Sequence, residues 1–258
     1  SVKQLYRDIF KQNGALKFPD HPLYVQWMEK LVSMADLVTV DTQFLQQRFG
    51  GIYLPNGKDT DIFNPDKYDF AVSKKRYGLS GYRVLMFPGA PRPHKGVEDV
   101  LIALEKLNKP DLKLVIVGSN PYDDYDKKVI KKWGDRIIKL SKFPVETMPE
   151  VLAAADVVVV PQRKNYTTLA QFPLKLTDGM AMGKPILSTK VGDIPEILGD
   201  TGYLVEPDSP DEIAEQINLI FDNLESAKER GKKARKRCIE KYSVSAMKPI
   251  LESAISRI

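Results

Sequence analysis

The sequence predicts an α/β protein built on a doubly wound parallel sheet, with a partial α/β unit in front of it. From residue 81 onward, short apolar runs typical of strands alternate with amphipathic segments of helical length. Residues 157–160 are four consecutive valines without polar alternation, as in a strand covered on both faces. The chain has 258 residues, 43% hydrophobic and 28% charged, which excludes wholesale disorder.

The first 66 residues are predicted to be a remnant of a preceding domain followed by a linker. The apolar residues Val25, Met28, Leu31 and Val32 predict a helix. A strand at 37–40, a helix at 42–49 and a strand at 52–54 follow. This is one βα unit and a second strand, not a complete domain.

Residues 67–240 are predicted to form the Rossmann-like domain, and residues 241–258 a C-terminal helix. The expected strands are 82–87, 112–117, 137–140, 157–160, 185–188 and 202–205. Helices are expected at 97–107, around 129–133, and at 148–155, 174–182 and 210–221. Thr147 is placed to cap one of these helices, and Ser209 with Glu212 has the spacing of a capping box.

In such a sheet, ligands bind outside the carboxyl ends of the strands. This rule selects loops 88–96, 118–126, 142–147, 161–173 and 189–193. The first of them joins a buried strand to a helix and begins with Gly89, where the backbone can approach a ligand closely. Arg92 and Lys95 add two cations beside a helix N-terminus, so a phosphate or diphosphate would suit it. A proline-stiffened surface loop with solvated cations remains an equal alternative.

The helix expected at 174–182 carries a second pair of charged residues. Asp178 is an acid that could accept hydrogen bonds from ribose hydroxyls. Lys175 lies three residues earlier on nearly the same face, where it could meet a phosphate. A plain ion pair between the two is the competing interpretation.

These segments, in this order, resemble the retaining glycosyltransferases of the GT-B fold, specifically the large family-4 (group 1) set that uses nucleotide-sugar donors. The similarity covers roughly residues 35–245 and comprises a co-linear series of motifs. They are Asn56-Gly57-Lys58-Asp59, the loop from Gly89 to Lys95-Gly96, Val117-Gly118, Ala155-Asp156 with Pro161, and Asp178-Gly-Met-Ala-Met-Gly-Lys-Pro185.

The resemblance implies a hexosyltransferase that uses a UDP- or GDP-sugar and an unknown acceptor (a sugar, a lipid-linked glycan or a small molecule). Arg92 and Lys95 would be catalytic, holding the donor diphosphate and stabilising its charge as the sugar leaves. Asp178 would bind the ribose, and the base would rest near Phe143. Backbone amides at Gln171 and Phe172 would meet the sugar or diphosphate.

This sequence departs from the family pattern at three places. Ala90 stands where the family has an arginine, Asp178 replaces a glutamate, and Ala170 replaces a further acid. Most of the acceptor-side domain is expected to be missing. A GT-B nucleotide-sugar epimerase and a non-catalytic nucleotide-sugar-binding module therefore stay open as alternatives.

No cofactor or metal is expected, because the nucleotide-sugar is itself a substrate. Cys238 is the single cysteine, and His21 and His94 are the only histidines, which makes a zinc site improbable. Asp124 and Asp126 form an Asp-x-Asp pattern, but acids at a helix N-terminus explain it equally well. His94 is expected to be a loop histidine without a catalytic part.

The net charge of +5 is concentrated late in the chain. Residues 228–241 contain eight basic and two acidic residues, so the remainder is close to neutral. A solvated helix face explains such a block, and peripheral membrane contact is the main alternative. Nucleic-acid binding is not expected, because no recognition motif accompanies the block. The absence of a secretory signal and the lone cysteine favour a cytoplasmic, reducing location.

Overall fold

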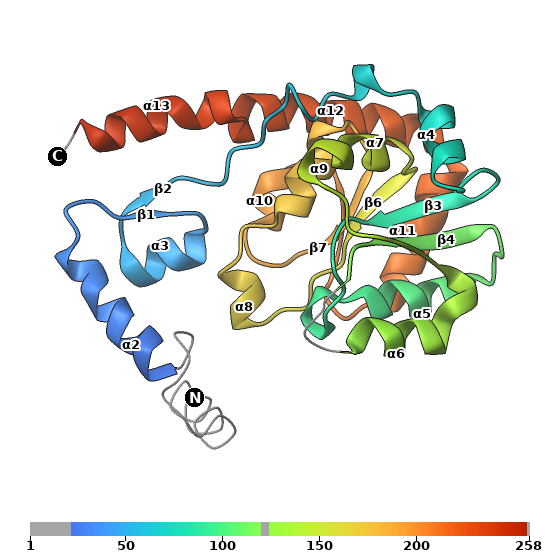
Figure 1. The fold of residues 1–258 in the computed structure, drawn as a ribbon, viewed down its shortest axis with the longest axis horizontal. Helices are drawn as coiled ribbons and strands as arrows, with labels where there is room; N and C mark the ends of the chain where they lie inside the picture. The colour runs from blue at the N-terminus through green and yellow to red at the C-terminus, as the bar shows by residue number, and fades with distance from the viewer. Residues whose placement is uncertain (1–21, 120–123, 257–258) are drawn as a thin grey trace.

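The structure is a computed structural model that describes residues 22–119 and 124–256. It consists of a large doubly wound α/β domain and a small unit formed by the N-terminal part of the chain (Figure 1). The large domain contains a six-stranded, all-parallel sheet with the order β5-β4-β3-β6-β7-β8. Its strands are β3 (Arg83–Phe87), β4 (Leu112–Val117), β5 (Ile137–Leu140), β6 (Val157–Val160), β7 (Ile186–Thr189) and β8 (Tyr203–Val205). The predicted fold class is confirmed.

Helices cover both faces of this sheet. One face packs against α5 (Val97–Leu107), α6 (Tyr125–Trp133) and α11 (Pro210–Asp222). The other packs against α7 (Met148–Ala153), α9 (Leu174–Ala181), α10 (Ile194–Leu198) and the long α12 (Leu224–Tyr242). Val157 and Val159 face the first layer, whereas Val158 and Val160 face the second. The unbroken valine run is therefore buried on both faces, as its composition predicts.

The small unit is a βαβ arrangement. It contains α2 (Pro22–Leu31), the 3-10 turn η1 (Val32–Met34), β1 (Thr39–Val40), α3 (Gln43–Phe49) and β2 (Ile52–Tyr53), and its two strands pair in parallel. The linker then passes through η2 (Pro65–Lys67) and α4 (Phe70–Arg76). The last helix, α13 (Val244–Ile255), continues from α12 after a break at Ser243 and extends over the small unit (Figure 1).

The linker is fixed at the break between α12 and α13. The amide of Lys58 donates to the carbonyl of Tyr242 (2.7 Å), and the amide of Val244 donates to the carbonyl of Lys58 (3.0 Å). A side chain at Gly57 would contact Met247 and Val244 of α13, so a residue without a Cβ fits here. These contacts tie the start of the linker to the C-terminal helices.

Two predicted helix caps are wrong. Thr147 already has helical backbone angles, because the 3-10 turn η5 (Val145–Thr147) precedes α7, and its side chain makes no capping bond. Ser209 does not cap α11 either, since its hydroxyl lies 3.4 Å from the carbonyl of Pro207. Glu212 instead accepts from the amide of Glu206 (2.9 Å).

Several short elements were not predicted from the sequence. They are α4, α8 (Tyr166–Leu169), α10, η3 (Pro93–Lys95) and η4 (Gly134–Arg136), together with η1, η2 and η5. Most are one or two turns long, which is too short to show a helical period.

Candidate functional site

The site lies where the strand order reverses, between β3 and β6. The chain proceeds from β3 to β4 and β5 on one side, and from β6 to β7 and β8 on the other. At such a switch point the loops after the two central strands separate and leave a crevice for a ligand. Here those loops are residues 88–96 after β3 and 161–173 after β6, two of the five that the sequence selects.

The two loops touch through Gly96. Its φ is +68°, and a Cβ at this position would collide with the carbonyl oxygen of Pro161. The amide of Arg163 donates to the carbonyl of His94 (3.0 Å) just beyond this contact. Glycine is required here both by the backbone conformation and by the close approach.

Arg163 clamps the second loop to α5. Its guanidinium makes two hydrogen bonds to the carboxylate of Asp99 (2.6 and 2.9 Å) and lies 3.0 Å from Asp208. These carboxylates raise the pKa of Arg163 above its usual value. Arg163 was not predicted from the sequence, because its partners are far away in the chain and no motif marks it. The clamp fixes the loop geometry on which the site depends.

Three cations gather at the crevice. Lys95 is only 6% exposed, and its ammonium donates to the side-chain oxygen of Gln171. Lys175, at the start of α9, lies directly over Gly89, where a Cβ would strike its side chain. Burial, with Lys175 and Arg92 nearby, lowers the pKa of Lys95 to about 8. Burial and Arg92 lower the pKa of Lys175, and Asp178 opposes this shift.

None of these three cations forms an ion pair with a carboxylate of the described residues. The bonded partner of Lys95 is a neutral amide, and the ammonium of Lys175 lies 5.5 Å from the ring centroid of Phe87. Arg92 is exposed in the loop. Like charges brought together without a counterion provide strong attraction for an anion.

Asp178 pairs with Lys58 and not with Lys175, so the competing interpretation, an ion pair within α9, is wrong. The ammonium of Lys58, from the linker, contacts the Asp178 carboxylate and lies 4.3 Å from the ring centroid of Phe63. Burial raises the pKa of Asp178, while Lys58 and then Lys175 hold it down. Lys58 belongs to the Asn-Gly-x-Asp turn noted in the sequence, but that turn does not reveal its partner.

The two aromatic candidates lie outside the cation cluster. Phe172 is buried in the core, with its ring centroid 6.3 Å from that of Tyr242. Phe143 follows β5, two strands from β3, and its ring packs edge-on against Tyr77 at 5.5 Å. Of the predicted site residues, the structure brings together Gly89, Arg92, Lys95, Gln171 and Lys175. Asp178 lies one turn further along α9. The rings of Phe143 and Phe172 are packed elsewhere.

The remaining candidates have structural partners or lie outside the described residues. Asp124 pairs with Lys128 (2.9 Å), and Asp126 lies 3.7 Å from Lys139. His94 is half-buried, and burial together with the nearby Lys95 and Arg92 lowers its pKa. His21 and part of loop 118–126 fall outside the described residues.

The fold and the site define a Rossmann-like α/β domain with a cationic switch point. The chain belongs to the glycosyl transferases group 1, whose family model matches residues 69–237. It is 29% identical over 223 residues to the N-acetyl-alpha-D-glucosaminyl L-malate synthase of Bacillus anthracis, covering 82% of this chain and 57% of that protein. It is also 29% identical, over 212 residues, to a GDP-mannose-dependent phosphatidylinositol monomannoside mannosyltransferase of Mycolicibacterium smegmatis, covering 76% of this chain and 56% of that protein.

Solved structures agree on the fold. The C-terminal domain of a group 1 glycosyl transferase from Francisella tularensis superposes with a TM-score of 0.63 at 25% identity, covering 73% of this chain and all of that domain. Anabaena HepE, crystallised with UDP-glucose, gives a TM-score of 0.78 at 23% identity, covering 91% of this chain and 68% of that one. The chain thus spans little more than half the length of the curated relatives that it matches.

Among the described residues, no helix combines the length and the apolar character needed to cross a membrane.

Proposed function

We propose that this chain is the donor-binding part of a glycosyltransferase. It binds a nucleoside-diphosphate hexose, UDP- or GDP-linked, and supports transfer of the hexose to an acceptor with retention of configuration. The observation that carries the proposal is the convergence of Arg92, Lys95 and Lys175 at the switch point, where none of them forms a salt bridge with a carboxylate of the residues that the structure describes.

The chemistry of the donor explains why three cations suit this position. A sugar diphosphate diester carries two negative charges, and its diphosphate gains another when the glycosidic bond breaks. Positive charges fixed in a partly buried site therefore stabilise the departing diphosphate more than the intact donor. In this proposal the leaving phosphate, held by Arg92 and Lys95, steers the incoming hydroxyl, and no metal is required.

The other predicted residues have places in the same proposal. Gly89 lets the backbone approach the diphosphate, and Gln171 fixes the ammonium of Lys95 toward the crevice. Asp178 receives the ribose hydroxyls and shares its charge with Lys58. The base lies toward Phe143, with the amides of Gln171 and Phe172 near the sugar.

The relatives support transfer over isomerisation. The two curated relatives named above are a synthase that joins a sugar to malate and a mannosyltransferase, and neither name describes an epimerase. The name of one includes GDP-mannose, whereas the solved structure of HepE holds UDP-glucose, so the proposal includes both uracil and guanine as the base.

The test is nucleotide binding by calorimetry with Lys95→Ala. Loss of one charge-assisted hydrogen bond should weaken UDP or GDP binding by about 1.5–3 kcal/mol. The matched control is Lys106→Ala, which removes an exposed lysine in the last turn of α5 and should leave the affinity unchanged. Equal affinity of Lys95→Ala and the parent chain for both nucleotides would refute the diphosphate site.

A further inference from the structure

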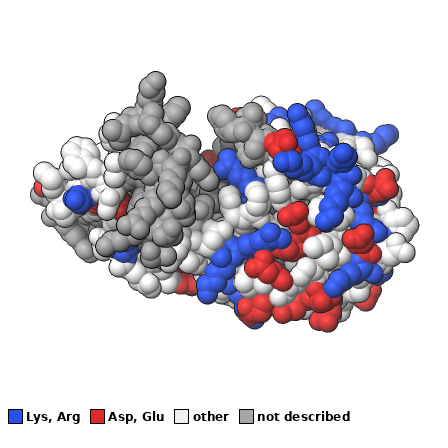
Figure 2. All heavy atoms as spheres, turned by 90° about the horizontal axis from the view of Figure 1, so that it is seen from below, with Lys and Arg blue, Asp and Glu red and all other residues white. Residues whose placement is uncertain are grey.

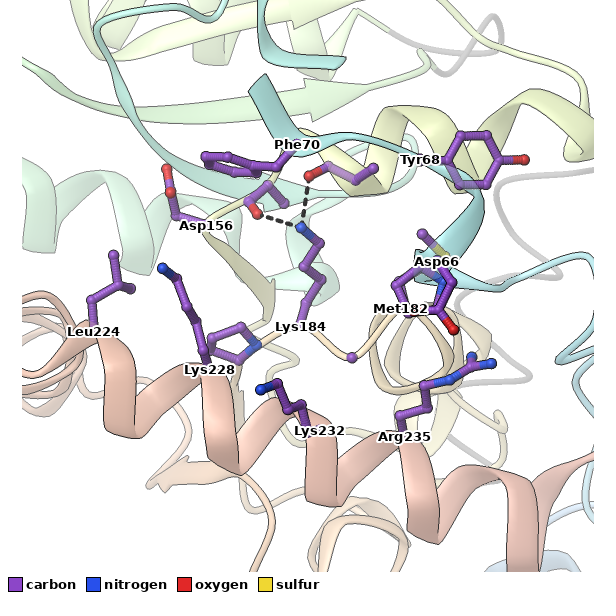
Figure 3. A pocket seen from close by; sticks show the side chains of 15 residues that line it. Asp66, Tyr68, Phe70, Asp156, Met182, Lys184, Leu224, Lys228, Lys232 and Arg235 are labelled. Carbon is purple, nitrogen blue, oxygen red and sulfur yellow. Dashed lines mark hydrogen bonds between the residues drawn. The ribbon is translucent and has the colours of Figure 1, made fainter. Parts of the chain in front are cut away.

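A second pocket lies at the amino ends of the central strands, whereas the switch point is at their carboxyl ends. It has a volume of about 480 Å³ and lies between α12, the segment around α4, and the turns that precede β6 and β7 (Figure 3). Asp156 comes directly before β6, and Pro185 directly before β7, so the pocket is at the amino ends of these strands. The proposed donor site is at their carboxyl ends, so the two sites are separate.

One face of α12 forms a wall of the pocket. Leu224, Lys228, Lys232 and Arg235 follow the helical spacing that places residues on one side, and all four line the cavity (Figure 3). Lys184, from the turn between α9 and β7, adds a fourth cation from the opposite wall. Two carboxylates, Asp66 and Asp156, also line it.

The positive charge in this pocket is incompletely neutralised. Asp156 is engaged by Lys74 (2.7 Å) and by the amide of Val84 (2.7 Å). The ammonium of Lys184 donates to the carbonyls of Ala153 (2.6 Å) and Ala155 (3.0 Å), which orient it without cancelling its charge. Burial lowers the pKa of Lys184 to about 8, as expected for an ammonium held away from water.

The basic block of residues 228–241 divides by residue type. Its arginines hold α12 against the domain: Arg230 stacks on Tyr203, Arg235 donates to the carbonyls of Phe63 and Ala181, and Arg237 donates to those of Glu196 and Ile197. Its lysines are exposed. The prediction of a solvated helix face is thus correct for the lysines of this block and wrong for its arginines.

The two pocket lysines are free to change partners. Lys228 and Lys232 are 50% and 71% exposed, and each pairs with a glutamate three residues earlier on α12. Exposed pairs of this kind contribute little stability, so an arriving phosphate can replace them. The two lysines therefore offer movable donors beside the fixed charges of Lys184 and Arg235.

Apolar groups flank these cations. The ring of Phe70 is 41% exposed and lies near the ammonium groups of both Lys74 (4.7 Å) and Lys184 (5.2 Å). Leu224, at the start of α12, lines the same pocket. A cationic pocket beside apolar side chains suits a ligand with a phosphate and hydrocarbon next to each other, as at a membrane surface.

We propose that this pocket binds the headgroup phosphate of an anionic phospholipid and docks this edge of the domain on a membrane surface. The phosphate lies between Lys228, Lys232 and Lys184, and Phe70 enters the headgroup region. α12 forms one wall of the pocket and continues into α13, which extends away from it over the small unit (Figure 1). The side below α5 and α6 carries both basic and acidic side chains (Figure 2).

The experiment is vesicle co-sedimentation of the whole chain. Vesicles are phosphatidylcholine with or without phosphatidylglycerol, and the test variant is Lys228→Glu with Lys232→Glu. The matched control, Lys233→Glu with Lys236→Glu, changes the net charge equally on the same helix but at positions outside the pocket. Binding to the anionic vesicles should weaken at least tenfold for the test variant and much less for the control. Phe70→Ser should weaken it as well, and added salt should lower binding of the parent chain.

Three outcomes would overturn the proposal. Equal losses in the two charge-reversal variants would indicate non-specific attraction, and absence of binding to anionic vesicles would exclude docking. Binding of soluble glycerol phosphate at the pocket without binding to vesicles would show that the phosphate comes from a soluble compound.

All four lysines are exposed, so unchanged thermal unfolding of both variants is expected and separates loss of binding from loss of fold. The test does not depend on nucleotide binding.

Discussion

At the scale of single residues, the position of one ammonium group determines how the proposed donor site responds to pH. Lys95 is enclosed by the loop that ends at Gly96, and its neighbours Lys175 and Arg92 carry the same charge. A buried cation near other cations loses its proton more easily than one in water. The pKa of about 8 means that the group is mostly charged at neutral pH in the free protein and mostly neutral above pH 9.

Nucleotide affinity should therefore fall as the pH rises through 8. A diphosphate binds the protonated ammonium, so each pH step above this pKa removes part of the binding-competent population, up to tenfold per pH unit. Calorimetric titrations with UDP or GDP between pH 7 and pH 9.5 measure the change. Lys95→Arg keeps its charge in this range and should reduce the decline. A decline of equal slope in both proteins would assign the pH dependence to another group.

At the scale of elements, the sequence predicts those parts of the fold whose signal is local. All six strands of the large sheet are found within a residue of their predicted bounds, because buried parallel strands are continuous apolar runs. The caps at Thr147 and Ser209 fail because neighbouring turns change the backbone angles. Arg163 and Lys58 were missed because each pairs with a residue that only tertiary structure brings near. For the same reason, the sequence identifies the cationic residues of the site but does not show that they lie together in space.

The attachment of α12 gives a prediction at this scale. The guanidinium of Arg235 bonds to carbonyls of the linker and of the last residue of α9. Arg235→Met should lower the free energy of unfolding by about 1.5–3 kcal/mol, because carbonyls lose a charged donor. Lys236→Ala, at the next position but exposed, should change it by less than about 0.5 kcal/mol. Urea titrations measure both, and equal effects would show that the guanidinium does not fasten the helix.

At the scale of the whole molecule, the small unit is held to the large domain by a polar contact and by the C-terminal helix. Asp193, at the start of α10, accepts from the amide of Gln43 (2.9 Å) and from the hydroxyl of Tyr53 (3.4 Å). Ile52 of β2 and Ile250 of α13 line the same small cavity. These contacts hold the small unit beside the switch point (Figure 1).

The carboxylate of Asp193 should control how firmly the small unit is attached. Burial raises its pKa, whereas the hydrogen bonds from Gln43 and Tyr53 of the small unit lower it, so these two bonds favour the ionised carboxylate. Asp193→Asn keeps one oxygen acceptor without the charge and should retain part of the attachment. Asp193→Ala removes both hydrogen bonds. Hydrogen exchange of the α3 and β2 amides should then accelerate about tenfold or more, while Asp200→Ala, an exposed control, should not change it. Unchanged exchange in Asp193→Ala would mean that the other contacts of the unit, among them α13 and the bond from Gln43 to Glu196, are sufficient to hold it.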